Sequence, residues 1–328
     1  RTWVETSPQD PASWYTTRDG QDVIWWSERD GWAHLYRFGP DGRLKNQITS
    51  GAWAVGWVAH VDEIARQIYF TARGREPGRL LYYAQLYRVN FDGTGLTLIT
   101  PEDASHELTF SPDGRFFVDS YSRVERPPVT VLRAAPDGRV IRTLETADVS
   151  RLAAFGWTPG EVFTTKARDG VTDIYGVMYR PSNFDSTRRY PIVENIYPGP
   201  QRGSVGRWEW SSGAEARAVA ELGFIVVRID HLGTPLRSKA FHDNYYGNFG
   251  DNGLPDHVAA LRQLAARYRW IDIDRVGIWG HSGGGFASTD AMLRYPDFYR
   301  VAVSSSGNHD NRSYNIYWAE KYQGLLVR

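Results

Sequence analysis

The sequence predicts an incomplete β-propeller followed by an incomplete α/β domain whose sheet is doubly wound and mostly parallel. Short strand patterns separated by Asp-Gly turns fill residues 1–155. In residues 156–328, strand patterns alternate with helical patterns of roughly 10–15 residues. A Gly-x-Ser-x-Gly motif at residues 280–284 lies between a predicted strand and a predicted helix. We therefore expect two domains, with a boundary after residue 155.

The composition of this 328-residue chain is that of a globular protein without a strong electrostatic bias. Hydrophobic residues make up 41%, and 38 Lys and Arg balance 38 Asp and Glu. This balance and the lack of a reader motif argue against a nucleic-acid partner. The chain has no cysteine, which excludes disulfides and thiol catalysis within it. The histidines of the first half lack ligand spacing, so we expect no metal and no cofactor.

Strand signals in the first half are short and rich in aromatic and β-branched residues, and Asp-Gly turns separate them. The predicted strands are 22–27, 33–38, 67–71, 84–89, 115–120 and 128–132. The pattern Leu-Tyr-Arg-aliphatic or aromatic occurs at 35–38 and again at 86–89, each followed by Asp-Gly. A repeat of roughly 40–50 residues built from short strands is typical of propeller blades. Only about three blades fit, whereas closed propellers usually have at least four, so we expect missing blades before residue 1.

The second half predicts a parallel sheet with its ligand site at the carboxyl ends of the strands. Strands are expected within 161–180 and at 191–197, 224–229, 276–279 and 301–306, with helices at 214–222, 254–268 and 286–295. Tyr197, Asp230, Ser282 and the loop at 306–310 all follow such strands. These residues are therefore expected to meet at one edge of the sheet.

The motif Gly280-His281-Ser282-Gly283-Gly284 matches the nucleophile elbow of α/β-hydrolases. A nucleophilic serine must stand on a tight, strained turn, and glycines on either side leave room where a Cβ would clash. The helix that follows points its N-terminal N–H groups at the site. We therefore predict Ser282 as the nucleophile and the backbone N–H of Gly283 as one oxyanion donor.

With these features in view, the chain resembles the prolyl oligopeptidase family (S9) of serine peptidases, in its dipeptidyl peptidase IV-like branch. Tyr197-Pro198-Gly199-Pro200 resembles the loop whose tyrosine hydroxyl is the second oxyanion donor, a role that falls on Tyr197. Residues 245–251 match the segment before the helix that precedes the nucleophile strand. Residues 314–324 resemble the region that builds the pocket for the substrate's proline. There the resemblance implies pocket roles for Tyr314 and Trp318.

The resemblance implies a serine peptidase that releases N-terminal dipeptides with Pro or Ala at the second position. It also implies peptide substrates and a secreted or periplasmic location, and it implies that the full-length protein can form a homodimer. The chain departs from the branch in three places. Gly283 stands where the branch has an aromatic residue, residues 230–234 replace a more basic loop, and nothing matches the paired glutamates that hold the substrate's amino group.

Catalysis by Ser282 needs a base and an acid that orients the base, and in this fold both follow the serine in the chain. One βα unit follows Ser282, so we expect a fragment truncated before the Asp and His of the triad, and an inactive one. His309 and Asp310 are adjacent, which does not suit two separated roles. His281 is interpreted as a packing or oxyanion-side residue, and Asp230 as a hydrogen-bond acceptor that stabilises a loop.

Two alternatives remain open. The first is an acylaminoacyl peptidase or esterase with the same nucleophile. The Tyr197 loop favours a peptidase, because lipase-like relatives use a His-Gly-Gly loop that this chain lacks. The second is a propeller-based binding protein with a catalytically dead hydrolase domain, and the intact elbow argues against it.

Overall fold

The structure, a computed structural model, describes residues 14–248, 250–310 and 314–325. Its contacts divide the chain into two compact units. The first comprises Arg1–Asp148 with two short later segments, Trp208–Trp210 and Leu236–Ala240, and the second comprises the rest. The boundary predicted after residue 155 falls just beyond α1 (Ser150–Ala154), which belongs to the second unit.

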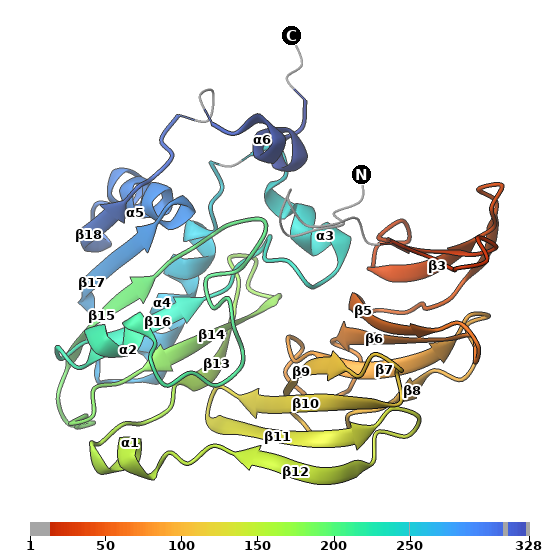
Figure 1. Cartoon of the computed structure of the whole chain (residues 1–328). Helices are drawn as coiled ribbons and strands as arrows, with labels where there is room; N and C mark the ends of the chain where they lie inside the picture. The colour runs from red at the N-terminus through yellow and green to blue at the C-terminus, as the bar shows by residue number, and fades with distance from the viewer. Residues whose placement is uncertain (1–13, 249, 311–313, 326–328) are drawn as a thin grey trace. The chain divides into compact units, whose positions relative to one another are not determined.

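The first unit contains three four-stranded antiparallel sheets, which Figure 1 shows in red, orange and yellow-green. Each sheet is a meander whose strands follow one another in chain order. This is the arrangement of propeller blades and confirms the predicted fold of the first half. The strands of the three sheets are β1 (Trp14–Thr16), β2 (Val23–Ser27), β3 (His34–Phe38), β4 (Leu44–Gln47); β5 (Ala54–Asp62), β6 (Gln67–Arg73), β7 (Gln85–Asn90), β8 (Thr97–Leu98); β9 (Ser105–Phe110), β10 (Phe116–Arg123), β11 (Arg126–Ala134), β12 (Val140–Thr146).

Asp-Gly turns connect neighbouring strands as the sequence predicts. Gly42, Gly93 and Gly114 all have positive φ, between 68° and 89°, which an L-residue with a side chain adopts only with strain. The outer strands of the three sheets were not predicted from the sequence. All seven residues of β12 are exposed, so this strand lacks the apolar alternation that reveals a strand.

The many aromatic residues of the first half build the cores between the blades. Trp53 stacks on Phe70 and on Tyr87, with 6.3 Å between the ring centroids in each pair. All three side chains are buried, and they come from different strands or loops. Aromatic packing of this kind buries a large area per residue, which suits thin blades with few core positions.

The two later segments of the first unit are held by specific contacts. Trp208 stacks on Tyr82 at 5.0 Å, and Ser105 Oγ donates to Glu209 Oε1 at 2.6 Å. The backbone N–H of Lys239 donates to the carbonyl oxygen of Gly31 at 2.9 Å. Sequence reasoning assigned both segments to the second domain, because contacts so distant along the chain leave no local pattern.

The second unit is built on a six-stranded sheet with the order β13-β14-β16-β15-β17-β18. β14 pairs antiparallel with β13 and β16, whereas β16, β15, β17 and β18 are mutually parallel. Figure 1 shows this sheet in green to blue. The strands are β13 (Glu161–Lys166), β14 (Asp173–Tyr179), β15 (Tyr190–Asn195), β16 (Ile225–Ile229), β17 (Ile271–His281) and β18 (Tyr299–Ser305). The predicted α/β fold with a mostly parallel sheet is confirmed.

Helices cover both faces of this sheet. The alternating residues of β16 separate the two faces, because Ile225, Val227 and Ile229 join one core cluster and Val226 joins the other. The first cluster includes residues of α4 (Leu254–Arg267) and α5 (Gly283–Arg294), and the second includes residues of α2 (Glu215–Ala220). The remaining helices are α3 (Lys239–His242), the short 3₁₀ helix η1 (Asp243–Tyr245) and α6 (Ile316–Gln323). Among the described residues, no helix has the length and apolar character needed to cross a bilayer.

A buried polar network ties three elements of the second unit together. Glu194 of β15 is 1% exposed, and its Oε2 lies 3.0 Å from Nδ1 of His257 on α4. The hydroxyl of Tyr299, at the start of β18, donates to Glu194 Oε1 at 2.8 Å. Burial raises the pKa of Tyr299 well above its ordinary value, and the neighbouring Glu194 charge raises it further. Tyr299 therefore remains a hydrogen-bond donor across the physiological range.

We expect Glu194→Ala to lower the free energy of unfolding by about 2–4 kcal/mol, because it leaves two buried polar groups without their partner. Urea denaturation of the full-length protein measures this loss. The matched control is Glu161→Ala, which removes a carboxylate that is 43% exposed and paired with Arg180. Its expected cost is at most about 1 kcal/mol. Equal losses in the two variants would contradict a structural role for the buried network.

Candidate active site

Ser282 stands on a strained turn between β17 and α5. Its φ is 57° and its ψ is −116°, a backbone conformation that is costly for a residue with a side chain. Its N–H donates to the carbonyl oxygen of Ser305 at 2.8 Å, and its own carbonyl accepts from Phe286 N–H at 3.0 Å. The end of β18 and the first turn of α5 thus hold the strained residue in place. This is the geometry of a nucleophile elbow.

The glycines of the motif are required by the close approach of the backbone. A Cβ on Gly280 would lie 2.5 Å from the carbonyl oxygen of Ile196, and a Cβ on Gly284 only 2.1 Å from the same atom. A Cβ on Gly285 would lie 2.3 Å from the carbonyl oxygen of Ser305. Backbone atoms cannot move aside as a flexible side chain can. The glycine pattern therefore lets the β15 end and the β18 end close around the elbow.

Gly283 differs from these glycines because it has free space beside it. A Cβ there would meet only Tyr197 Cζ, at an ordinary 3.9 Å. Gly283 is also the first residue of α5, so its N–H has no acceptor within the helix. The short distance from Gly283 to Tyr197 Cζ, the carbon that carries the hydroxyl, shows that the tyrosine ring lies next to the elbow. The two predicted oxyanion donors therefore lie on neighbouring residues of one site.

A cavity opens in front of Ser282 and holds about 570 Å³ of empty space, part of it open to solvent. It contains every site residue that the sequence singled out: Ser282, Gly283, Tyr197, Tyr314 and Trp318. Its lining residues are Tyr197, Pro198, Gly199, Pro200, Gln201, Asp251, Asn252, Ser282, Gly283, Phe286, Asn308, Tyr314 and Trp318. Most of these side chains are apolar, aromatic or neutral, which suits an uncharged substrate group.

Aromatic rings form one wall of the cavity. The rings of Tyr314 and Trp318 meet edge to face, with their centroids 5.3 Å apart. Trp318 also contacts the ring of Tyr322, which is fully buried and anchors α6. This wall places the two pocket residues predicted from the resemblance beside each other. Phe249, in the other segment matched by the resemblance, lies outside the described residues.

Another part of the cavity lining is fixed by an ion-pair network. Arg168, on the turn between β13 and β14, binds Asp251 and also Asp256 on α4, whose carboxylate it reaches at 2.8 Å. Burial raises the pKa of Asp251, but the hydrogen bonds and the charge of Arg168 outweigh it, and the net pKa lies below the ordinary value. Asn252 Nδ2 donates to Asp290 Oδ2 at 3.0 Å. Asp251 is thus a charged and paired wall residue.

The two histidines nearest to Ser282 in the sequence, His281 and His309, each have a contact of their own. The imidazole of His281 is exposed, and its Nδ1 lies 3.0 Å from Ser305 Oγ. The imidazole of His309 folds against its own loop, where its Nε2 would lie 2.5 Å from a Cβ on Gly307. Asp230 accepts a hydrogen bond from Val205 N–H at 3.0 Å, which confirms its interpretation as a loop-stabilising acceptor.

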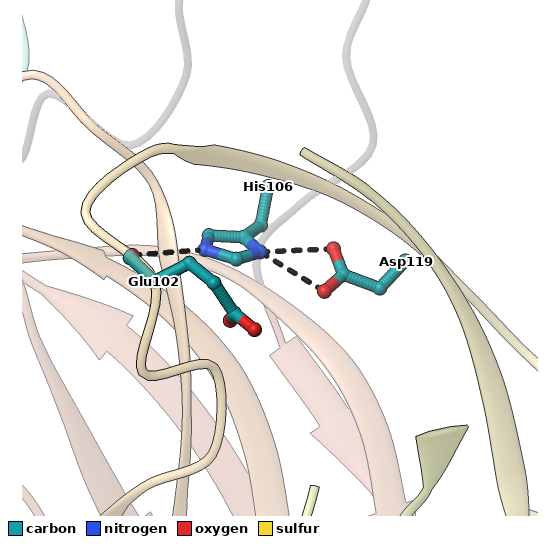
Figure 2. Close-up of side chains that lie close together, drawn as sticks. All are labelled: Glu102, His106 and Asp119. Atoms are coloured by element: carbon teal, nitrogen blue, oxygen red, sulfur yellow. Dashed lines mark hydrogen bonds and ion pairs between the residues drawn. The ribbon is translucent and has the colours of Figure 1, made fainter. Parts of the chain in front are cut away.

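One group of residues in the first unit has the composition of a metal site. Ligand atoms of Glu102, His106 and Asp119 lie within 4.8 Å of one another. Figure 2 shows the His106 ring between the Glu102 backbone and the Asp119 carboxylate, with Nδ1 2.9 Å from Asp119 Oδ1. Arg133, which is 1% exposed, donates to Asp119 at 2.8 Å and to Glu102 at 2.7 Å. The guanidinium already supplies the positive charge that a metal ion would bring, so we interpret the cluster as structural.

Sequence reasoning missed several lining residues, notably Gln201, Asn252, Phe286 and Asn308. Gln201 follows directly on the predicted Tyr197 loop, but no sequence pattern indicates that its side chain turns back toward the tyrosine. Phe286 lies one helical turn after Ser282, and this spacing could have shown that it faces the same site.

A strained serine between a parallel strand and a helix, at the carboxyl edge of a mixed α/β sheet, defines the α/β-hydrolase class. Two family models match the chain. The "Dipeptidyl peptidase IV (DPP IV) N-terminal region" matches residues 1–128, and the "Prolyl oligopeptidase family" matches residues 210–328. The chain belongs to the prolyl oligopeptidase family, in its dipeptidyl peptidase IV-like branch.

Individual relatives agree with this assignment. The chain is 32% identical to human dipeptidyl peptidase 8 over 84% of its own length and 32% of the relative's. It is 27% identical to dipeptidyl peptidase 4 of Arthroderma otae over 89% of its length and 38% of the relative's. A crystal structure of a candidate dipeptidyl aminopeptidase IV from Bacteroides ovatus superposes with a TM-score of 0.84 at 26% identity, covering 97% of this chain and 47% of that one. The chain thus spans about a third of the length of the curated relatives.

We expect Gly284→Ala to destabilise the second unit by about 3 kcal/mol, because the added Cβ cannot fit beside the carbonyl oxygen of Ile196. Thermal unfolding of the full-length protein measures the loss. Gly213→Ala is the matched control, because Gly213 is exposed and its Cβ would meet no atom within 4 Å. If the Gly284→Ala protein were as stable as the Gly213→Ala protein, the backbone of residue 284 would have room for a Cβ beside Ile196, which would contradict this prediction.

Proposed function

We propose that the full-length protein is a serine exopeptidase that removes dipeptides with Pro or Ala at the second position from peptide N-termini. One observation carries this proposal. Ser282 is held in a strained conformation that opens into the cavity containing Tyr197 and the two aromatic wall residues. The names of the relatives, dipeptidyl peptidases 8 and 4, supply the dipeptide specificity.

In the proposed mechanism, Ser282 Oγ attacks the carbonyl carbon of the scissile amide while its proton passes to a histidine base. The resulting oxyanion accepts hydrogen bonds from the Tyr197 hydroxyl and the Gly283 N–H. Collapse of the tetrahedral intermediate expels the amine, which takes up the proton. Water then hydrolyses the acyl-enzyme by the same steps, and the serine regains its proton.

The cavity wall suits a compact apolar residue at the substrate's cleavage site. The edge-to-face pair of Tyr314 and Trp318 presents aromatic surface, on which a pyrrolidine ring or a methyl group packs without losing a hydrogen bond. Arg168 pairs with Asp251 and also with Asp256, so its guanidinium offsets part of the negative charge at this wall. These features support a substrate with an uncharged side chain at this position. We further propose a secreted or periplasmic protein that can form a homodimer.

The first test measures activity of the full-length protein against Gly-Pro and Ala-Pro anilides, an N-blocked X-Pro anilide and a short ester. We expect cleavage of the two free-amino dipeptides alone, and its loss in Ser282→Ala, because acyl transfer needs the Ser282 oxygen. Cleavage of the blocked anilide would favour an acylaminoacyl peptidase, and cleavage of the ester alone an esterase. A properly folded protein that cleaves none of them would favour a catalytically dead binding protein.

We expect the 328-residue chain by itself to show no turnover above that of its Ser282→Ala variant. The two described histidines that are nearest to Ser282 in the sequence have other contacts. His281 lies against Ser305, and His309 lies against its own loop. A serine without its base is a weak nucleophile. Turnover by this chain comparable to that of the full-length protein would show that a residue within it acts as the base.

A further inference from the structure

The side chain of Gln201 reaches the hydroxyl of Tyr197. Its Nε2 donates a hydrogen bond to the Tyr197 hydroxyl oxygen at 3.0 Å. Both residues line the cavity in front of Ser282. An amide NH₂ group can only donate, so the tyrosine oxygen accepts this bond with a lone pair. The hydroxyl proton of Tyr197 is therefore left available for another acceptor.

The loop between these two residues is built to hold them together. A Cβ on Gly199 would lie 2.6 Å from Tyr197 Cε1 and 2.8 Å from Gln201 Oε1, so only glycine permits both side chains their positions. Gly199 also forms a β-bridge with Arg202, whose guanidinium lies 5.3 Å from the centre of the Tyr197 ring. Pro198 and Pro200 on either side restrict the backbone further. The contact is thus a property of a rigid loop.

Which atom of the Gln201 amide faces Tyr197 decides whether the tyrosine hydroxyl proton is available to a substrate. Gln201 Oε1 is buried and has no hydrogen-bond partner among the described residues. If this oxygen faced the tyrosine instead, it would accept the hydroxyl proton and compete with a substrate oxyanion for it. When Nε2 faces the tyrosine, the hydrogen bond that it donates polarises the hydroxyl group. The Tyr197 hydroxyl then becomes a stronger donor, because hydrogen bonds in a chain reinforce one another.

We infer that Gln201 is a positioning residue that directs the Tyr197 hydroxyl proton toward the oxyanion formed on Ser282 attack. This inference rests on the proposed serine peptidase function, and it adds a determinant of the oxyanion hole that lies outside the motifs of the sequence. Gln201 acts through Tyr197 and transfers no proton itself. Its effect is therefore expected on kcat, because the oxyanion exists only after the substrate is bound.

The test compares Gln201→Met, Gln201→Glu and Tyr197→Phe in the full-length protein, with Gly-Pro anilide as substrate. Gln201→Met keeps the length of the side chain but removes the donor, and kcat is expected to fall about 10-fold with KM nearly unchanged. Gln201→Glu places a carboxylate that accepts the Tyr197 proton and withdraws it from the site. Its kcat is expected to approach that of Tyr197→Phe, a loss of about 10²–10³-fold.

Two further readouts separate this role from a purely structural one. As the pH falls toward the carboxyl pKa, the kcat of Gln201→Glu relative to that of the wild-type protein is expected to rise, because a protonated carboxyl no longer has to accept the tyrosine proton. The ratio is used because protonation of the histidine base lowers kcat in both proteins. In the double variant with Tyr197→Phe, the Glu substitution is expected to cost nothing more, since its effect passes through the hydroxyl. Gln21→Glu, an exposed change of the same type, is the control and leaves kcat unchanged.

The outcomes are distinguishable. If the wild-type protein cleaves the substrate and both Gln201 variants keep its kcat, the role of Gln201 is refuted while the proposed function stands. An additional loss from Gln201→Glu in the Tyr197→Phe background also refutes it. A wild-type protein that cleaves no substrate refutes the proposed function and this inference together. Matching thermal unfolding midpoints among the variants show that lost activity is not lost folding.

Discussion

The close approach of the β17–α5 turn to the carbonyl oxygen of Ile196 is the constraint on which the site depends. Both Gly280 and Gly284 contact this single atom so closely that neither could carry a side chain. Ile196 directly precedes Tyr197, so the contact that seats the nucleophile turn also sets the position of the tyrosine loop. Two glycines thereby fix the separation of the proposed nucleophile and the proposed oxyanion donor.

The sheet beneath supplies the rest of the arrangement. β15, β17 and β18 are parallel neighbours, so the residues that follow them emerge at the same edge. Glu194, two residues before Ile196 on β15, is buried in hydrogen bonds with His257 and Tyr299. The register of β15 against α4 and β18 is therefore set by a polar contact as well as by apolar packing. Such a contact tolerates displacement poorly, because a shifted Glu194 would be buried without partners.

The sequence predicted most of what depends on local pattern. The Asp-Gly turns, the alternation of strand and helix and the Gly-x-Ser-x-Gly motif were enough to predict three blades, the parallel sheet and Ser282. Strands such as β12 were missed because they lie exposed and lack apolar alternation. Gln201 and the Glu194–His257–Tyr299 network were missed for another reason. Each joins side chains whose proximity arises only from the folded backbone, and a glutamine or a glutamate in isolation carries no signal of its partner.

The proposed chemistry has an electrostatic part, which stabilises the oxyanion, and a proton-transfer part, which activates Ser282. The electrostatic part combines one backbone group with one side chain: the N–H of Gly283 at the start of α5, and the hydroxyl of Tyr197, which accepts a hydrogen bond from Gln201 on the same loop. The second part requires a general base, which in the proposed mechanism is a histidine. In serine hydrolases the oxyanion hole and substrate binding alone retain roughly 10³–10⁴-fold acceleration when the triad is removed. The two parts are thus separable in energy. The proposed oxyanion donors are held by contacts among the ends of β15 and β18, the turn after β17 and the start of α5. The positions of the two oxyanion donors, Tyr197 and Gly283, are therefore set by glycine contacts and by the rigid Tyr197 loop, and they do not depend on the position of the base.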